Sequence, residues 1–455
     1  MNARLTMLML AASAMSLSAP PVLAQAKPAA PAVRPVQAAP MPRAPIASPP
    51  VALPGTPAPL AEAAAQPAPP PLPPPLWDVL NAQDLLYSIR EVGKEGLEPA
   101  DYDPAGLEAA LASGDPLRLS QEANARFNML SNDLALGHVD KSARIAWFVV
   151  DKDLDAARQD ALLRNALVTH TVRPALDGLL PAHPQYAALK AALALTPEGQ
   201  TSKLNRIKLN MDRWRWLPRD LGQKYIIVNV PGFHATLVED GVNRWKHRAI
   251  AGATKTPTPQ LSAMAVGVML NPSWEVPPSI TREVAGKKGF VPVRKDGKII
   301  RWSQPPGPTN ALGQLKFVMY NPHNIYLHDT NARSRFDSRM RALSHGCIRT
   351  QHIMDLATEL LGDDGGEWTP EKVQAQLATG KSKQANFVKP VPVYIVYFSA
   401  AALNDGKIVD YADLYGRDGK ALAALQTKDG GTALAAAAKA KKAPAKPAAK
   451  VASSN

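Results

Sequence analysis

The chain has 455 residues, a net charge of +13 and a single cysteine. One cysteine excludes an internal disulfide and a zinc site built from cysteines alone. The charge does not require a nucleic-acid partner, because much of it lies in the terminal segments, including six lysines between residues 427 and 455. No apolar run after residue 24 is long enough to span a membrane.

The N-terminal segment predicts export. Arg4 precedes an apolar stretch from Leu5 to Leu17, and small residues lead to Ala24. This pattern is typical of a secretory signal peptide, and no cysteine follows that would carry a lipid anchor. We therefore expect a signal peptide over residues 1–24 and a mature protein outside the cytoplasm. An uncleaved membrane anchor is the alternative, and serine and proline within the apolar stretch argue against it.

Low-complexity segments flank the central part of the chain. Residues 25–76 consist mostly of alanine and proline, a composition typical of an extended, semi-rigid linker. Residues 427–455 are rich in alanine and lysine, which predicts a disordered tail. This tail is interpreted either as a solvated end or as a weak contact with an anionic polymer of the wall or membrane.

Residues 77–200 are predicted to be helical, because apolar side chains recur at spacings of three and four. The pairs Asp115-Pro116 and Leu180-Pro181 indicate helix boundaries. No residues of this region have the spacing of a catalytic motif. The histidines of this region are interpreted as helix-end or surface residues. They are His138, His170 and His183.

Residues 201–426 are predicted to be mainly β-structure with a few helices. Seven β-rich runs are found after Lys224. The pair Asp240-Gly241 lies between the second and the third run and indicates a hairpin. A helix is expected from Ile353 to Leu361, ending at Gly362. Residues 274–314 contain few strand signals, so they are interpreted as a long loop or lid. The expected strands are Tyr225–Val230, Phe233–Val238, Trp245–Ile250, Ala263–Leu270, Lys316–Tyr320, Asn324–His328 and Val391–Phe398.

The residues with catalytic potential are concentrated in one segment. His328 is followed after fifteen residues by Ser344 to Arg349, with the sequence SHGCIR. A passive core cysteine is the usual role of a lone thiol, but the glycine and the polar residues beside Cys347 argue against a core strand. A cysteine nucleophile needs a base to form thiolate. Strand alternation places Tyr326 and His328 on one face, from which His328 could reach Cys347.

Three other interpretations compete for these residues. A zinc site has enough ligands but lacks the spacing of known zinc motifs. A papain-like hydrolase normally has its cysteine before its histidine in the chain, whereas here the histidine comes first. A sortase-like transpeptidase shares the order of histidine, cysteine and arginine but lacks SHG before the cysteine. The possible zinc ligands are His323, His328, His345, Cys347 and His352.

His328, the fifteen-residue gap and SHGCIR together resemble the signature of the L,D-transpeptidase catalytic domain of the YkuD type. Other segments resemble the large Gram-negative periplasmic branch of that family, which makes 3→3 cross-links in peptidoglycan. Many relatives contain a peptidoglycan-binding domain inserted before the segment that corresponds to Arg213–Pro218. In this chain only a short segment, about Thr196 to Asn205, occupies that place. The similar segments are Gly96–Tyr102 of the helical scaffold domain, Arg213–Pro218, Asn271–Ile280 and Asn310–Gly313.

The resemblance implies a role for each residue of the motif. Cys347 would be the nucleophile and His328 its general base. Asp329 would support His328 through its backbone carbonyl or, alternatively, through its carboxylate. Ser344 and His345 would support the loop, and Gly346 with Cys347 would hold the oxyanion. Arg349 would either fix the turn or bind a substrate carboxylate.

The resemblance also implies the reaction and the fold. The donor would be a tetrapeptide stem, cut before its terminal D-Ala, and no metal or diffusible cofactor is implied. The acceptor stays open between a stem amine, water and a protein amine, and a catalytically idle scaffold associated with the wall is the alternative to an enzyme. Carbapenems would acylate the enzyme, and the location would be the periplasm. The implied fold class is α+β, with a mainly-β, sandwich-like catalytic domain over residues 201–426 after a helical scaffold domain over 77–200.

Residues 283–308 are a second candidate functional segment. They contain four glycines that could serve as pivots. Two interpretations stay open: a solvated surface loop, or a lid whose cations attract acidic stem peptides. The cations in or beside this segment are Arg282, Lys287, Lys288, Arg294, Lys295, Lys298 and Arg301.

Overall fold

The computed structural model describes residues 73–363, 365–403 and 407–430. The predicted signal peptide, residues 25–72 of the predicted linker and residues 431–455 of the predicted tail lie outside these ranges. Within the described residues, no helix has the length and apolar character needed to cross a membrane.

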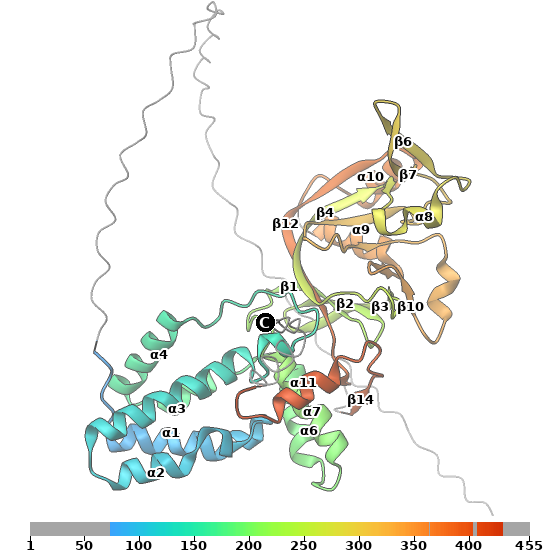
Figure 1. Cartoon of the computed structure of the whole chain (residues 1–455). Coiled ribbons are helices and arrows are strands. Elements are labelled where there is room, and N and C mark those ends of the chain that lie inside the picture. Colours follow the sequence, from blue (N-terminus) through green and yellow to red (C-terminus); the bar gives the residue numbers. More distant parts are fainter. Residues whose placement is uncertain (1–72, 364, 404–406, 431–455) are drawn as a thin grey trace, which may run out of the picture. The chain divides into compact units, whose positions relative to one another are not determined.

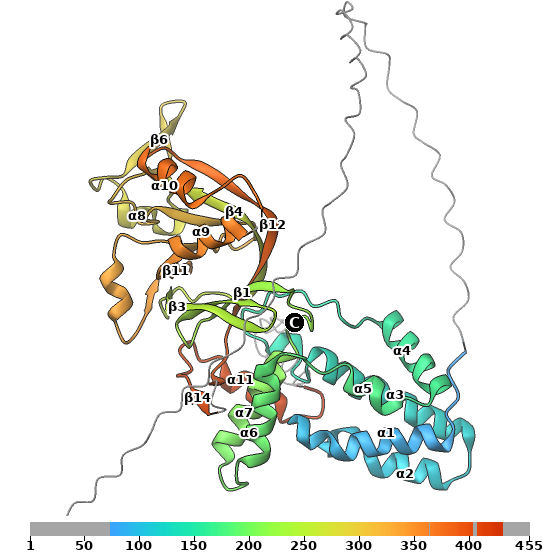
Figure 2. The same cartoon turned by 180° about the vertical axis from the view of Figure 1, so that it is seen from behind.

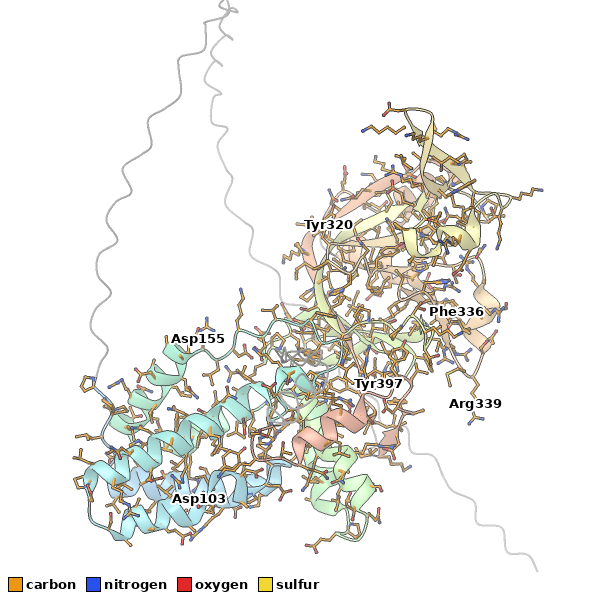
Figure 3. The ribbon with its side chains drawn as sticks, viewed as in Figure 1. Asp103, Asp155, Tyr320, Phe336, Arg339 and Tyr397 are labelled. Carbon is orange, nitrogen blue, oxygen red and sulfur yellow. The ribbon has the colours of Figure 1, made fainter. Side chains whose placement is uncertain are left out.

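The first half of the described chain is helical, as the apolar spacing predicted (Figure 1). Aspartates precede four of the helices, and each side chain accepts a hydrogen bond from a backbone N–H of the first turn, which stabilises the helix start. Figure 3 labels two of these caps, Asp103 and Asp155. The helices are α1 Val79–Glu91, α2 Pro104–Ala112, α3 Pro116–Leu136, α4 Ala156–Thr169, α5 Val172–Asp177, α6 Pro184–Leu195 and α7 Thr201–Trp214.

Helix α7 begins at Thr201, after the expected domain boundary, so helical structure extends into the region predicted to be mainly β and the boundary at residue 200 stays a prediction. The segment after α7 is buried around the carboxylate of Asp212. This carboxylate accepts hydrogen bonds from Trp216 Nε1 at 2.8 Å and from the backbone N–H of His138 at 2.8 Å. Arg215 is also fully buried, and its guanidinium donates to the hydroxyl of Tyr186 at 2.6 Å. The Arg213–Pro218 segment therefore stabilises the fold, because each buried charge has a polar partner.

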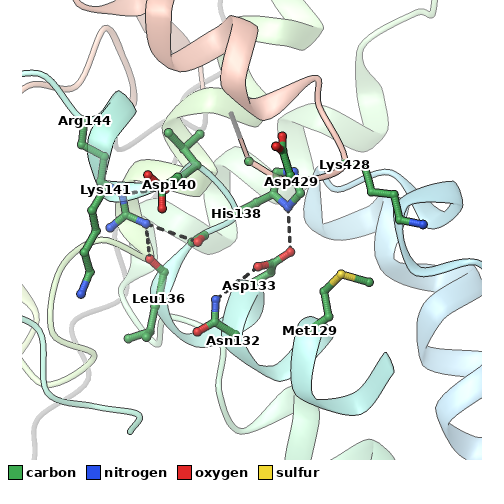
Figure 4. Close-up of a pocket in the computed structure, with 13 residues that line it drawn as sticks. Met129, Asn132, Asp133, Leu136, His138, Asp140, Lys141, Arg144, Lys428 and Asp429 are labelled. Atoms are coloured by element: carbon green, nitrogen blue, oxygen red, sulfur yellow. Dashed lines mark hydrogen bonds and ion pairs between the residues drawn. The ribbon is translucent and has the colours of Figure 1, made fainter. Parts of the chain in front are cut away.

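All three histidines of the helical region lie at helix ends, as expected; the alternative of a surface position is wrong for His138, which is buried, and His183 is half-buried. His138 follows α3 and is buried, with Nδ1 2.7 Å from Asp133 Oδ2 and Nε2 2.7 Å from the carbonyl oxygen of Thr427 (Figure 4). His183 caps α6 and stacks on Trp214, with a centroid separation of 4.1 Å.

The second half of the described chain is dominated by one sheet of nine strands, in the order β10-β3-β11-β9-β8-β4-β12-β1-β2. The predicted hairpin is confirmed, because Asp240 and Gly241 both have positive φ, as a two-residue turn of this type requires. The strands are β1 Lys224–Asn229, β2 His234–Glu239, β3 Val242–Gly252, β4 Leu261–Leu270, β8 Leu315–Met319, β9 Leu327–His328, β10 Ala342–Ser344, β11 Ile348–Thr350 and β12 Lys383–Val396.

The nine-stranded sheet closes on itself through β3. The first part of this long strand pairs with β2, and its last part pairs with β10 and β11. The apolar side chains of the sheet form one core, against which α9 Ile353–Asp363 and α10 Pro370–Ala378 pack (Figure 2). The predicted end of α9 at Gly362 is wrong, because the helix includes this glycine. The α+β fold class with a sandwich-like, mainly-β domain is confirmed.

The interpretation of residues 274–314 as a loop is wrong. This segment forms a separate three-stranded sheet in the order β5-β7-β6, with the short helix α8 Thr281–Val284 between β5 and β6. The strands are β5 Trp274–Glu275, β6 Val291–Lys295 and β7 Lys298–Gln304. Asp296 and Gly297 make the turn with positive φ, a hairpin signal that the surrounding glycines and prolines obscured.

The chain ends, within the described residues, with a small hairpin and one helix. They are β13 Ala400–Ala402, β14 Ile408–Asp410 and α11 Asp418–Leu425. The hydrogen bond from the His138 ring to the backbone of Thr427 connects the segment after α11 to the end of α3.

The His138–Asp133 pair gives a testable stability effect. Burial lowers the pKa of His138. The hydrogen bond to Asp133 and the negative charge of that residue outweigh this effect and raise the pKa to about 9. The folded-state pKa thus exceeds the unfolded value of about 6.5. Protonated His138, paired with Asp133, therefore stabilises the folded state fully below about pH 6.5, and this stabilisation is lost as the pH rises through about 9. We expect His138→Ala to lower the free energy of unfolding by about 3 kcal/mol at pH 6, and by less at pH 10.

Urea unfolding at the two pH values checks this expectation. The control is His170→Asn, because His170 is exposed and has φ of 51°, a conformation that asparagine tolerates. A destabilisation by His138→Ala that does not change with pH would contradict the account.

Candidate active site

The centre of the nine-stranded sheet carries the first half of the predicted site. Strand β9 lies between β8, to which it is antiparallel, and β11, to which it is parallel. Ile325 and Leu327 enter the hydrophobic core, whereas the rings of Tyr326 and His328 lie 5.7 Å apart. The alternation predicted for this segment is confirmed, although only residues 327–328 form a regular strand.

Cys347 reaches this strand from the loop between β10 and β11. The N–H of Ile348 donates to the carbonyl oxygen of Tyr326 at 3.0 Å, which places Cys347 beside Tyr326. The sulfur lies 3.6 Å from the carbonyl oxygen of Asn324, and it also interacts with the side chain of Tyr326. Among the described residues, no hydrogen bond joins the sulfur to His328. Such bonds often tighten only when substrate is bound.

The imidazole of His328 is buried and neutral. Burial lowers its pKa, and the positive charges of Arg349 and Lys316 lower it further, to about 3, against an opposing contact with the backbone of Asp329. Its Nδ1 atom has no hydrogen-bond partner among the described residues. An unprotonated imidazole can accept a proton, which is what a general base must do.

The thiol of Cys347 is also neutral. Burial raises its pKa above the ordinary value, although contacts with Tyr326 and the charges of Lys316 and Arg349 act in the opposite direction. The site therefore contains a thiol and an imidazole rather than a preformed thiolate–imidazolium pair. A proton would move only when the sulfur attacks an electrophile.

Ser344 holds the loop in shape. Its hydroxyl donates to the carbonyl oxygen of Cys347 at 2.6 Å and accepts from the N–H of Gly346 at 3.1 Å. Gly346 has φ of 119°, which favours glycine, and its carbonyl oxygen accepts from the hydroxyl of Thr258 at 2.7 Å. The N–H of Gly346 is thus engaged, whereas the N–H of Cys347 has no hydrogen-bond partner among the described residues.

The carboxylate of Asp329 contacts a neighbouring turn rather than the imidazole. It accepts hydrogen bonds from the N–H of Gln314 at 3.0 Å and from Arg333 Nη2 at 2.9 Å. A side chain at Gly313 would collide with it, because a Cβ atom there would lie 2.3 Å from Asp329 Oδ2. Only the backbone of Asp329 contacts His328.

Of the two remaining predicted residues, His345 lies in the loop itself and Arg349 lies on β11, the strand after it. His345 Nε2 lies 3.2 Å from the carboxylate of Glu283 on α8. Arg349 follows Cys347 on β11, and its Nε atom is buried without a hydrogen-bond partner among the described residues. The structure therefore brings all seven predicted site residues to one region around β9 and β11.

Two further residues of this region, Lys316 and Tyr326, have no role predicted from the sequence. Lys316 on β8 lies opposite His328, and its Nζ is 5.1 Å from the centroid of the Tyr326 ring. Tyr326 interacts with the side chains of both Cys347 and Trp274. For Lys316, the sequence did contain a signal of a special role, namely a lysine within the otherwise apolar run of β8.

The possible zinc ligands do not gather around one point. Among the described residues, no group of three or more histidine, cysteine, aspartate or glutamate side chains could hold a metal ion. The ring of His323 instead packs on Phe148, with centroids 4.0 Å apart, and the ring of His352 packs on His247 at 4.8 Å.

Two parts of the chain match known family models. Residues 223–393 match the model described as the L,D-transpeptidase catalytic domain, YkuD, and residues 74–193 match the model described as the scaffold domain. A Haemophilus influenzae protein, assigned provisionally by its name to the L,D-transpeptidases, is 30% identical over 240 residues. The match covers 47% of this chain and 48% of that protein, so the chain spans about half the length of this relative.

Similar solved structures each cover about two fifths of this chain. A crystal structure of a cysteine-to-serine mutant of an Enterococcus faecium L,D-transpeptidase is 13% identical, covering 40% of this chain and 52% of that chain with a TM-score of 0.22. The solution structure of the catalytic domain of an Enterococcus faecium enzyme, acylated by ertapenem, is 15% identical. It covers 39% of this chain and 99% of that chain, with a TM-score of 0.22.

The neutral state of Cys347 predicts how fast it reacts with iodoacetamide. Because burial raises the thiol pKa, the alkylation rate should keep rising with pH beyond the midpoint of an ordinary cysteine. The same protein in denaturant provides the reference midpoint. A plateau of fast alkylation below pH 7 would instead reveal a preformed thiolate–imidazolium pair and contradict the neutral site.

Proposed function

We propose that this chain forms 3→3 cross-links in peptidoglycan through a thioester on Cys347. Its residues 223–393 match the model of the L,D-transpeptidase catalytic domain, YkuD, and its residues 74–193 match the model of the scaffold domain. One observation carries the proposal. A neutral, buried imidazole and a neutral thiol lie on adjacent elements of the matched domain, and the spacing of His328 and Cys347 resembles the family motif.

The first half of the reaction follows from these two groups. His328 accepts the proton of Cys347, and the sulfur attacks the carbonyl carbon that precedes the terminal D-Ala of a tetrapeptide stem. The negative charge then develops on the carbonyl oxygen, to which the N–H of Cys347, unpaired among the described residues, can donate. His328 returns the proton to the amine of D-Ala, which leaves, and the thioester remains.

The second half repeats this proton transfer with a new nucleophile. The side-chain amine of a diamino acid in another stem attacks the thioester, and His328 accepts its proton before returning it to the sulfur. The N–H of Gly346 can donate a second hydrogen bond to the oxyanion only if its hydrogen bond to the hydroxyl of Ser344 breaks. Hydrolysis by water would give a carboxypeptidase by the same steps, and attack by a protein amine would attach that protein to the wall.

The proposed location is the periplasm. The predicted signal peptide over residues 1–24 and the alanine- and proline-rich linker support this proposal, since together they would place the catalytic domain on an extended tether outside the cytoplasm. Carbapenems are proposed as acylating inhibitors, by analogy with the ertapenem-acylated Enterococcus faecium domain.

Substitution of the nucleophile tests the proposal. We expect Cys347→Ser to keep the melting temperature of the wild type and to lose 3→3 dimer formation, because a hydroxyl is much less acidic than a thiol. The measurement is chromatography of muropeptides after incubation with purified sacculi. Dimers formed by the Cys347→Ser variant at a rate near that of the wild type would refute the proposal, and hydrolysed tripeptides without dimers from the wild type would indicate a carboxypeptidase.

The three-stranded sheet is proposed to be a lid that favours the amine over water. The contact between Glu283 and His345 connects the base of this sheet to the catalytic loop. Cations gather at the β6–β7 turn, where Lys295 and Lys298 are directly paired across the hairpin and are exposed. Positive charge there would attract acidic stem peptides and hold an acceptor near the thioester.

Neutralising the turn tests the lid. The triple variant Arg294→Gln, Lys295→Gln and Lys298→Gln should be acylated by a carbapenem at the wild-type rate, because acylation needs only Cys347 and its neighbours. The ratio of dimer to hydrolysed tripeptide should fall several-fold. An unchanged ratio would exclude a role of these cations in partitioning. The matched control neutralises three exposed cations elsewhere: Arg118, Lys203 and Lys372.

A further inference from the structure

Two cations flank the buried imidazole on the same level of the sheet. Lys316 on β8 and His328 on β9 are directly paired, and His328 is also directly paired with Arg349 on β11. Residues paired across adjacent strands project from the same face. Lys316, His328 and Arg349 therefore form a row across three strands, with a cation on each side of the imidazole.

Neither cation is neutralised by a carboxylate in the part of the chain that the structure describes. Among the described residues, no carboxylate forms an ion pair with Lys316 or Arg349, although most buried or half-buried arginines elsewhere in the chain have such a partner or several carbonyl acceptors. The Nε atom of Arg349 is buried without a hydrogen-bond partner among the described residues. Other buried arginines, such as Arg213 and Arg215, also have an unpaired Nε, but their remaining guanidinium nitrogens have acceptors, whereas Arg349 has none among the described residues. A guanidinium without any acceptor is costly unless a ligand supplies one.

The ammonium of Lys316 is held toward the nucleophile. Its Nζ lies over the ring of Tyr326, 5.1 Å from the centroid, and Tyr326 contacts Cys347. Both cations also exert an electrostatic effect on the sulfur. Another cation, Arg335, also acts electrostatically on Arg349 and lowers its pKa.

We propose that Lys316 and Arg349 form an anion subsite that binds the C-terminal carboxylate of the donor stem peptide beside Cys347. This inference rests on the proposed function and extends it to substrate selection. Lys316 thereby gains a role in substrate binding. Of the two roles left open for Arg349, the proposal selects binding of a substrate carboxylate over fixing of the turn.

The position of the subsite identifies this carboxylate. The bond to be cut lies one residue from the C-terminus of the stem, and one residue spans about 3.8 Å. The terminal carboxylate must therefore lie close to the carbonyl that the sulfur attacks, and hence beside Lys316 and Arg349. The carboxylate on the diamino acid side chain is separated from that carbonyl by a flexible chain and need not lie there.

The subsite would also explain a preference for tetrapeptide stems. A stem with one more residue would place its carboxylate one residue farther from the sulfur, where these two cations no longer meet it. Selection would then come from the position of a charge, because a charged group left without its partner loses a charge-assisted hydrogen bond.

The experiment compares three tetrapeptides. They are the natural peptide, the same peptide with a C-terminal amide, and the same peptide with the diamino acid carboxylate amidated. Binding is measured by calorimetry in the Cys347→Ser variant, which undergoes no acylation, and thioester formation is measured by mass spectrometry in the protein with Cys347. The test variant is Lys316→Met, which keeps an aliphatic stem over Tyr326.

We expect Lys316→Met to weaken binding and acylation of the natural peptide by about 10- to 100-fold, the range of a hydrogen bond to a charged group. The C-terminal amide should bind weakly to both proteins, and Lys316→Met should change its binding little. The peptide with the amidated diamino acid should behave like the natural one. The matched control is Lys383→Met, because Nζ of Lys383 also lies over a ring, 5.2 Å from the centroid of Trp368.

The outcomes separate the two proposals. An equal loss for the acid and the C-terminal amide would refute the subsite, and so would a loss that follows the diamino acid carboxylate. Selective binding of the acid without any thioester would keep the subsite and refute the proposed function. Thioester formation at equal rates from the acid and the amide would keep the function and refute the subsite.

Discussion

The imidazole of His328 is buried where three short strands meet, and this burial determines the chemistry of the site. A buried imidazole between two cations stays unprotonated, so it can take a proton but cannot hold the sulfur as a ready-made thiolate. Burial likewise keeps Cys347 protonated. The resting site is therefore unreactive toward solvent and becomes reactive when an electrophile reaches the sulfur. Such a resting state suits a lone cysteine that is proposed to work in an oxidising compartment.

Segments outside the catalytic motif fix the surroundings of this pair. Asn310 is fully buried, and its carboxamide donates to the carbonyl oxygens of Pro272 and Pro305, both at 2.9 Å. Asn271 donates to the carbonyl oxygen of Leu377 at 3.1 Å, beyond which α10 ends. These amides hold the base of the three-stranded sheet with buried hydrogen bonds. The segments that resemble the family outside its motif thus have structural roles, and they set the position of the proposed lid.

Local signals in the sequence were sufficient for much of the fold and for the members of the site. The hairpin at Asp240-Gly241 and the alternation around His328 depend on neighbouring residues, so the sequence predicted both. The burial of His138 was missed because its acceptor at Thr427 is 289 residues away in the chain. Lys316 was missed although a lysine within the apolar run of β8 was a local signal, because only the register of β8 against β9 places it beside the imidazole. Such a register is not visible in the strand's own sequence.

The central claim is that His328 is the base that activates Cys347. Rapid-quench mass spectrometry of thioester formation from a tetrapeptide tests it most directly, with His328→Ala as the variant. His352→Asn is the control, because His352 is exposed and has φ of 52°, which asparagine tolerates. The account predicts a loss of about 10²- to 10⁴-fold in the acylation rate for His328→Ala and almost none for the control. A His328→Ala variant that is folded and acylates at the wild-type rate would contradict it.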